Sequence, residues 1–220
     1  MKNLFLIAFA MLIIPCISEA QSTYKKAKSE VKKTASTTQF GIKGGLNFYN
    51  LHNSNDAKYD TRTGYHLGLL AHMHINNQWA IQPELVYSSQ GAKFKNSGVE
   101  TKLRLGYINL PIMVQYMFDN GFRIEGGPQI GFRTGAKEVT GETSIDIKSQ
   151  TTAADFGLGL GVGYLTPSGF GIDARYNWGL TNINKHNTMS SMNRGLQLGL
   201  FYQFGQAGIK TNAHNSKYTK

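Results

Sequence analysis

The chain has 220 residues, of which 40% are hydrophobic, 11% aromatic and only 16% charged, a composition too apolar for a disordered protein. A polytopic helical membrane protein is also excluded, because the single long apolar run lies at the N-terminus. The formal net charge of +10 does not indicate a nucleic-acid partner, because residues 39–204 carry only +3, whereas residues 21–38 carry +4 and residues 205–220 carry +3.

Residues 1–20 have the pattern of an export signal. Lys2 supplies a positive start, and residues 4–14 form an apolar run of 11 residues, which is too short to span a bilayer. Small residues at Ser18 and Ala20 match the two positions that a signal peptidase reads. The sequence therefore predicts a signal peptide over residues 1–20, cleaved after Ala20, and an exported protein.

Cys16, the only cysteine, raises the alternative of a lipid-anchored protein. Pro15 disfavours it, because that processing prefers a small residue before the cysteine. If Cys16 leaves with the signal, the mature chain has no disulfide and no thiolate for a metal.

The lysine-rich segments 21–38 and 205–220 are expected to be a periplasmic linker and a periplasmic tail. Solubility alone would explain their lysines; contact with peptidoglycan, anionic lipid or a periplasmic partner is the alternative.

Residues 39–204 repeat one pattern, in which apolar residues alternate with small or polar ones. This period of two is typical of β-strands with one apolar face. Each repeat has about the 9–11 residues that a tilted strand needs to cross a bilayer. The eight segments are residues 39–49, 64–75, 79–87, 102–118, 121–132, 156–165, 169–180 and 194–204.

The longest segment, residues 102–118, changes its parity. Leu105 and Tyr107 occupy odd positions, whereas the apolar set continues at even positions from Ile108 to Val114. If all of these side chains face one side, an extra residue must be inserted between Tyr107 and Ile108. The sequence therefore predicts a β-bulge at this point.

The connections alternate in length. Three are tight and turn-like, at Asn76-Asn77, residues 119–121 and residues 166–169; four are long and polar, at residues 49–62, 90–101, 134–153 and 181–193. Short turns on one side and long loops on the other are typical of outer-membrane barrels. The fold class predicted over residues 39–204 is all-β, an eight-stranded antiparallel up-and-down transmembrane β-barrel with both termini on the periplasmic side.

Aromatic residues recur near both ends of the segments. Four pairs on single segments are eight residues apart, which in a tilted strand covers roughly 20 Å of the roughly 25 Å apolar band. We therefore expect two aromatic girdles at the membrane interfaces. Their members are Phe40, Trp79, Phe118, Phe122, Tyr164, Phe170 and Phe204 at the short-turn end, and Phe48, Tyr65, Tyr87, Tyr107, Phe132, Phe156 and Trp178 at the long-loop end.

A soluble eight-stranded barrel, such as a lipocalin, is the main structural alternative. It would place the apolar set inside and the intervening residues in water. The surface of residues 156–165 would then consist of glycine at positions 157, 159, 161 and 163. On the inner face of a narrow barrel the same glycines are expected, because they leave room for bulky neighbours such as Arg123, Arg133 and Arg175.

Three segments, WAIQPELVYSSQGAK, YINLPIMVQYMF and GFRIEGGPQIGF, resemble signatures of the PorT-like outer-membrane β-barrel proteins, often labelled porin-family proteins. The resemblance covers residues 39–204 and implies an outer-membrane location, contact with outer-membrane lipid and assembly by the barrel-assembly machinery. One member type assists a secretion system. The chain departs from the pattern after Phe204, where 16 residues follow the last strand's terminal aromatic, the usual assembly signal.

Charged residues on the inner parity are expected to fill the barrel. An eight-stranded barrel is just wide enough for its side chains, and buried charges need partners. We therefore predict a plugged lumen without conductance; a narrow porin for small solutes or ions is the alternative. The predicted lumen charge network comprises Lys43, Glu84, Arg123, Glu125, Arg133, Asp155, Asp173 and Arg175, with Arg194 as a further candidate.

Two groups of residues resemble catalytic or metal sites. His52, Ser54 and Asp56 have the residue types of a hydrolase triad, and a lipid-modifying enzyme is the second functional alternative. Such residues often meet by chance in a polar loop. His72 and His74 share the inner parity with His66, but no third metal ligand is fixed in register, so solvated lumen histidines explain them better.

The glycine-rich run GLGLGVG superficially resembles a phosphate-binding loop. Its period of two and the lack of a following helix assign it to a strand instead. No cofactor is predicted, and the protein is not expected to be an enzyme.

The third long loop, residues 134–153, contains alternating Ile145 and Ile147, which predicts a hairpin above the membrane. Exposed strand edges of this kind bind partners by β-augmentation. The expected function is therefore non-enzymatic: a structural, binding or secretion- or transport-accessory role, with a protein partner at the extracellular loops or the periplasmic tails.

Overall fold

The computed structural model describes residues 38–53, 59–96, 99–183 and 191–205. The expected signal peptide (1–20), nearly all of the linker (21–38) and nearly all of the tail (205–220) lie outside the described residues. Within the described ranges, no helix combines the length and apolarity needed to cross a membrane. One 3₁₀ turn, η1 (Lys148–Gln150), follows the strand β6 (Thr143–Asp146).

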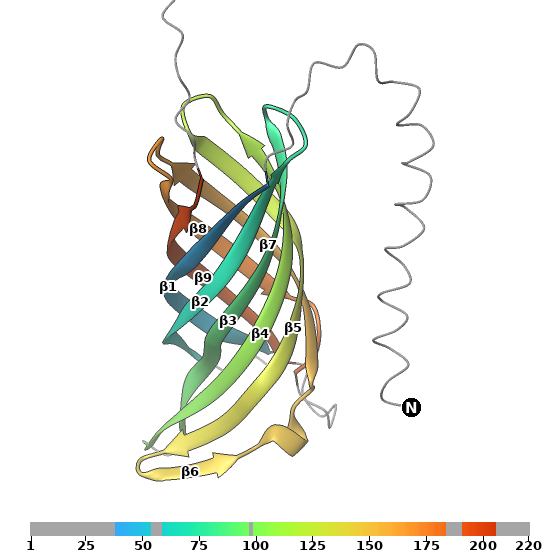
Figure 1. Cartoon of the computed structure of the whole chain (residues 1–220). Coiled ribbons are helices and arrows are strands. Elements are labelled where there is room, and N and C mark those ends of the chain that lie inside the picture. Colours follow the sequence, from blue (N-terminus) through green and yellow to red (C-terminus); the bar gives the residue numbers. More distant parts are fainter. Residues whose placement is uncertain (1–37, 54–58, 97–98, 184–190, 206–220) are drawn as a thin grey trace, which may run out of the picture. The chain divides into compact units, whose positions relative to one another are not determined.

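Eight long antiparallel strands form a closed ring (Figure 1). Their order around the ring is β4-β3-β2-β1-β9-β8-β7-β5, and β5 pairs with β4 to close it. The predicted eight-stranded up-and-down barrel is therefore confirmed; β6 is an additional short strand that pairs with β5 outside the ring. The ring strands are β1 (Thr38–Asn53), β2 (Asp60–His74), β3 (Trp79–Asn96), β4 (Val99–Met117), β5 (Phe122–Thr140), β7 (Ala154–Leu165), β8 (Phe170–Gly179) and β9 (Ser191–Gln203).

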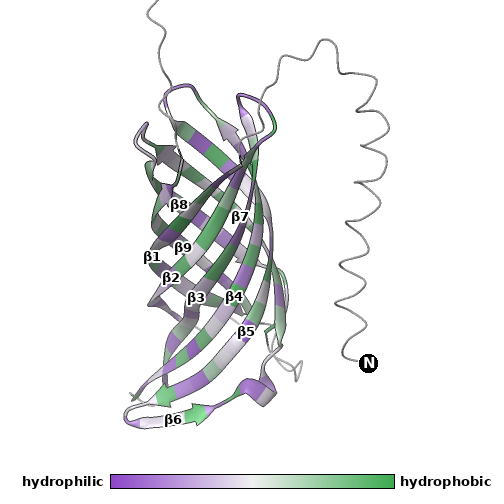
Figure 2. Cartoon of the chain, viewed as in Figure 1, coloured by the Kyte–Doolittle hydropathy of each residue, from purple (hydrophilic) through white to green (hydrophobic). Residues whose placement is uncertain are grey.

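The two faces of the ring differ in polarity, and Figure 2 shows the resulting alternation along each strand. In β7, the glycines are buried, whereas Phe156, Leu158 and Leu160 between them are exposed. The same inversion runs around the ring: large apolar side chains point outward, and lysine, arginine, glutamate and amide side chains are buried inside. A water-soluble barrel has the opposite arrangement, so the outer face is suited to lipid.

The tight turns lie at one end of the ring, here called the short-turn end, as predicted. Gly121 and Gly169 adopt φ values of 88° and 92°, which favour glycine. The Asn76 side-chain oxygen accepts hydrogen bonds from the backbone N–H groups of Gln78 (2.9 Å) and Trp79 (2.8 Å). These residues form the turns because asparagine and glycine stabilise the sharp reversal that a short connection needs.

The opposite end, here called the long-loop end, has more strand than predicted. Residues 90–96 and 99–101, predicted as part of a loop, are strand instead: β3 continues to Asn96, and β4 begins at Val99, which pairs with Asn96. The prediction failed because the polar sequence of this segment was interpreted as a loop. The backbones of β3 and β4 continue to pair here although neither strand has an apolar face. The hairpin expected in residues 134–153 is confirmed, since β6 pairs with β5 from Thr140–Thr143 onward.

The predicted position of the bulge, between Tyr107 and Ile108, was wrong. β4 keeps a single parity, so that Leu105 and Tyr107 point inward and each is only 1% exposed. The irregularity lies in β5: Gly106 pairs with Gly135 and Tyr107 pairs with Arg133, which leaves Thr134 as the extra residue. The apolar side chains change from the outer to the inner face near the long-loop end because the lumen itself becomes apolar there.

Candidate functional site

The centre of the lumen contains a network of buried ion pairs. The Arg175 guanidinium donates to the Glu84 carboxylate at 2.9 and 2.8 Å, and its Nε donates to Glu125 Oε1 at 2.7 Å. Lys43 Nζ lies 3.3 Å from Glu84 Oε2 and 3.1 Å from Asp173 Oδ2. These five side chains, here called the central network, join positions that are far apart in the chain.

The central network crosses the whole width of the barrel. Its members come from β1, β3, β5 and β8, which are alternate strands of the ring. Inward side chains of alternate strands lie in one layer of a barrel, because the strands are tilted and staggered. Glu84 on β3 and Arg175 on β8 stand four strands apart in either direction, on opposite walls. Their hydrogen bonds therefore span the space that a pore would need.

A second layer lies beside the central network. Gln82 donates to Glu84 Oε1 at 2.8 Å, and Gln115 donates to Glu125 Oε2 at 2.7 Å. Arg123 donates to Gln115 Oε1 at 3.3 Å, and its guanidinium carbon lies 5.4 Å from the ring centre of Phe201. The amides thus complete the hydrogen bonding of the carboxylates, and an aromatic face offsets the charge of Arg123.

Neutral polar side chains form the next layer toward the long-loop end. The Asn47 amide nitrogen donates to Ser88 Oγ at 2.9 Å, and its oxygen accepts from Gln197 at 3.1 Å. Asn177 donates to Gln197 Oε1 at 3.0 Å and to Tyr49 Oη at 3.1 Å. This layer again connects side chains across the barrel and leaves the lumen packed with protein groups.

A cluster of buried apolar side chains lies at the long-loop end of the ring. Its members come from four ring strands and from two connecting segments, which contribute Ile147 and Ile183. The Ile147 N–H donates to the Ala136 carbonyl (3.0 Å), and the Ile183 N–H donates to the Ser191 carbonyl (2.9 Å), so both segments are tied to the ring. The cluster, here called the apolar cap, consists of Leu51, Ala92, Leu105, Tyr107, Ala136, Ile147 and Ile183.

The glycine face of β7 makes room for the charged side chains, as predicted for two of the three arginines. A methyl group on Gly159 would lie 3.2 Å from the Arg175 Cδ, and one on Gly163 would lie 3.3 Å from the Arg123 Cγ. A methyl group on Gly161 would lie 3.0 Å from Glu125 Oε1 and only 2.8 Å from a backbone carbonyl oxygen. The inward face of β7 thus leaves the space that the Arg175, Arg123 and Glu125 side chains occupy.

Six of the eight predicted network residues lie together: Lys43, Glu84, Arg123, Glu125, Asp173 and Arg175. With three cations and three carboxylates, this group is formally neutral, which burial of charge requires. Its amide partners, Gln82 and Gln115, were not singled out from the sequence. Their inner parity on β3 and β4 is the signal that could have indicated them.

The other predicted charges lie elsewhere. Arg133 donates to the carbonyl oxygens of Thr151 (3.2 Å) and Thr152 (3.0 Å) and thus holds the connecting segment rather than a carboxylate. Asp155, near the start of β7, is a hydrogen-bond partner of Thr181. The prediction that Arg194 points inward was wrong: on β9 it shares the parity of the exposed Leu196, not of the buried lumen residues.

Thirteen of the fourteen predicted girdle residues lie on the outer face or at a turn and are exposed or half-buried. Tyr107 is the exception, because it belongs to the apolar cap. The prediction omitted Tyr116 and Tyr202, whose rings lie 5.1 Å from Trp79 and 4.7 Å from Phe170 at the short-turn end. Their outer parity and their place near the turns could have indicated them.

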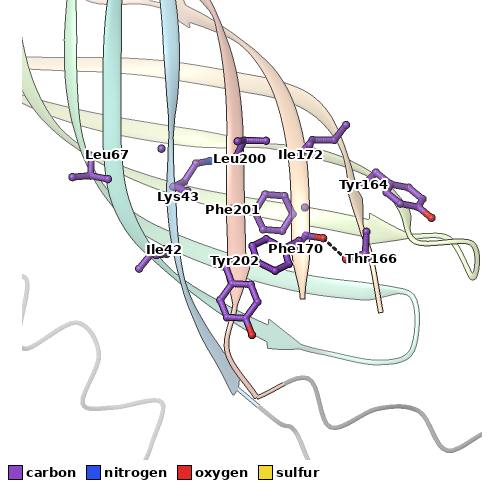
Figure 3. A pocket seen from close by; sticks show the side chains of 12 residues that line it. Ile42, Lys43, Leu67, Tyr164, Thr166, Phe170, Ile172, Leu200, Phe201 and Tyr202 are labelled. Atoms are coloured by element: carbon purple, nitrogen blue, oxygen red, sulfur yellow. Dashed lines mark hydrogen bonds between the residues drawn. The ribbon is translucent and has the colours of Figure 1, made fainter. Parts of the chain in front are cut away.

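An apolar groove of about 590 Å³ lies on the outer wall near the short-turn end (Figure 3). It follows β1, β9 and β8, and Ile42, Leu200 and Ile172 are among its exposed lining side chains. Thr166 Oγ1 donates to the Phe170 carbonyl at its edge (2.8 Å). This groove is part of the lipid-facing surface.

The two residue groups that resemble a hydrolase triad and a metal site were not predicted to be functional, and the structure describes them only in part. His52 is exposed on β1, whereas Ser54 and Asp56 lie outside the described residues. The His72 and His74 rings are 4.6 Å apart, and His66 Nδ1 is 2.8 Å from Asn47 Oδ1. Among the described residues, no group of three or more His, Cys, Asp or Glu side chains could hold a metal ion.

Comparison with solved structures shows a common fold. Neisserial surface protein A is 16% identical with a TM-score of 0.56, and the alignment covers 76% of this chain and 99% of that one. Ail, the attachment invasion locus protein of Yersinia pestis, is 18% identical with a TM-score of 0.50, covering 76% and 98%. No curated protein matches the sequence.

Residues 20–185 match the family described as outer membrane protein beta-barrel domain, which is most of the chain. The lipid-suited outer face and the closed ring agree with that match. The chain therefore belongs to the outer membrane protein beta-barrel domain family, and its location is the outer membrane.

Proposed function

We propose that the protein is a non-conducting outer-membrane barrel with a structural or partner-binding role. Its short-turn end and both termini face the periplasm, and its long-loop end faces outward, as the difference in connection length favours. An accessory role in secretion or transport, which the PorT-like resemblance implies, falls within this proposal. No catalytic constellation in the described residues favours an enzyme.

The central network carries the proposal. The Arg175–Glu84 hydrogen bonds join opposite walls, and both side chains are at most 2% exposed. The apolar cap adds a second closure at the long-loop end, where Tyr107 is 1% exposed. An ion would have to break buried charge pairs and then pass an apolar constriction, and both steps are costly.

Conductance of the refolded protein in planar bilayers tests this proposal. Folding is first verified by the heat-sensitive mobility of the barrel on a gel. We expect a folded barrel without discrete channel steps, with a known porin as the positive control. Reproducible steps would overturn the proposal and favour the narrow porin for small solutes or ions.

The strand β6 is the surface that we propose for a protein partner. All four of its residues are exposed, Ile145 to 57%, and among the described strands it pairs with β5 alone. Its second edge therefore offers backbone groups for a further strand. A photocrosslinker at Ile145 in intact outer membranes should give a discrete adduct that a crosslinker at Lys95 does not give. Equal labelling at both positions, or none, would contradict this use of β6.

A further inference from the structure

A cationic pocket of about 500 Å³ lies on the outer face near the long-loop end. Four of its lining residues are cations, and none is an acid. Arg104, Lys137 and Lys148 are exposed, and Arg62 is half-buried. The pocket, here called the basic pocket, is lined by Arg62, Tyr65, Tyr87, Ser89, Arg104, Leu105, Gly106, Thr134, Gly135, Ala136, Lys137 and Lys148.

Two of these cations face each other across neighbouring strands. Arg104 on β4 is directly opposite Lys137 on β5. Like charges at such positions repel and destabilise a sheet unless an anion lies between them. An acid, Asp146 on β6, is opposite Lys137, but it does not line the pocket. Its Oδ1 instead accepts a hydrogen bond from the Lys148 backbone N–H at 2.8 Å. Within the described residues, none of the four cations makes an ion pair at 4 Å or less.

Arg62 is held in place before any ligand binds. Its Nη1 and Nη2 lie 3.3 and 3.2 Å from Ser89 Oγ, and Nη1 also donates to the Gln90 carbonyl. Arg104 and the Tyr65 and Tyr87 side chains line the same pocket as Arg62. A fixed guanidinium among further cations and hydroxyl groups matches the geometry and charge of a phosphate group.

The position of the basic pocket indicates the source of the phosphate. Tyr65 and Tyr87 are exposed outer-face tyrosines whose ring centres lie 6.0 Å apart. On the same strands the exposed Leu67 and Leu85 follow toward the short-turn end, so the tyrosines mark the boundary between the apolar band and the polar zone. Lipid headgroups lie at this level, and aromatic residues prefer it.

We propose that the basic pocket binds the phosphate groups of a lipid headgroup, with the acyl chains lying along the outer wall. The closure of the lumen plays no part in this inference. The orientation proposed above places the pocket in the outer leaflet, where phosphorylated lipid A is the lipid to test. Binding neutralises the repulsion between Arg104 and Lys137 and ties β2, β4 and β5 to the surrounding membrane.

Lipid binding to the refolded full chain in neutral maltoside micelles tests the proposal. The probes are diphosphorylated lipid A, the same lipid after enzymatic removal of its phosphates, and inorganic pyrophosphate, with bound lipid counted by native mass spectrometry. We expect lipid A to bind at least about tenfold more tightly than its dephosphorylated form, because charge-assisted contacts are lost with the phosphates. Equal binding of the two lipids would overturn the proposal, as would pyrophosphate binding as tightly as lipid A.

A matched pair of variants locates the site. Arg104→Gln/Lys137→Gln removes two cations of the pocket, and Lys93→Gln/Lys95→Gln removes two cations of β3 that do not line it. The first pair should weaken lipid A binding at least about tenfold, and the second should not. Without lipid, the first variant should unfold at the same or a higher temperature, because repulsion is relieved. Equal loss of binding in both variants, or early unfolding of the first without lipid, would overturn the proposed site.

A comparison of phosphatidylglycerol with lipid A tests the phosphate site separately from the proposed orientation of the barrel. If the basic pocket prefers phosphatidylglycerol and the Arg104→Gln/Lys137→Gln variant loses that preference, the phosphate site stands and the proposed orientation is wrong. Conductance measurements are unaffected by either result, so the plugged lumen is tested separately.

Discussion

Arg175 and Glu84 are 91 positions apart in the chain, yet two hydrogen bonds of 2.9 and 2.8 Å join them across the lumen. They come from strands on opposite walls of the ring, β8 and β3. Closure of the ring brings them together, and their charges then depend on each other because both are withdrawn from water. This pair therefore connects the stability of the barrel with the proposed closure of its lumen.

Arg175→Met should strongly destabilise the barrel, because it leaves the Glu84 and Glu125 carboxylates buried without their shared cation. We expect a loss of about 3–5 kcal/mol in the free energy of unfolding. Urea unfolding in lipid vesicles measures it. Lys102→Met is the control, since Lys102 makes an exposed ion pair with Glu100 at 3.2 Å and should lose less than about 1 kcal/mol. Similar losses in both variants would contradict the buried network.

The effect of Arg175→Met should also be nearly independent of salt. Salt screens exposed charges over roughly 10 Å at 0.1 M but has little access to buried pairs. Unfolding measured in low and high sodium chloride should give the same difference between wild type and variant. A difference that shrinks with salt would mean that water and ions reach the lumen, contrary to the plugged barrel.

Gly161→Ala should destabilise the barrel far more than Gly135→Ala. The added methyl group at Gly161 meets a backbone carbonyl oxygen at 2.8 Å, whereas at Gly135 no described heavy atom lies within 4 Å. Overpacking of this kind costs about 1–3 kcal/mol. Thermal unfolding of the two variants, compared with wild type, is the measurement. If Gly135→Ala is the more damaging change, the proposed role of the β7 glycines is wrong.

Spin labels at Tyr107 and Ile108 should report opposite environments. Ile108 is 39% exposed on the outer face, and Tyr107 is 1% exposed within the apolar cap. In Tyr107→Cys and Ile108→Cys variants, lipid-soluble oxygen should relax the label at Ile108 much more strongly than the label at Tyr107. Equal accessibility would contradict the single parity of β4 and restore the bulge at this position.

The fold follows from local patterns in the sequence. A period of two separates an apolar face of each strand from a polar one. The glycine face of β7 must be the inner face, because the bulky side chains in the lumen need the space that glycine leaves. Asparagine and glycine at the tight turns define the strand order, since short connections force antiparallel neighbours. From these features the eight strands, most of their inner residues and most of the girdles could be predicted.

The tertiary structure decided which side chains contact each other inside the lumen and how far the strands extend. Lys43, Glu84 and Arg175 share an inner parity with Arg133, but only the closed, tilted ring determines which inward side chains lie in one layer. Tyr107 was misplaced because apolarity was equated with the outer face, whereas the apolar cap makes the lumen apolar at one end. Alternation specifies a face, which is a local property of a strand. Register, closure and the contacts between distant strands depend on the whole ring, so the sequence by itself determined a membrane barrel, and the tertiary structure decided how it is closed.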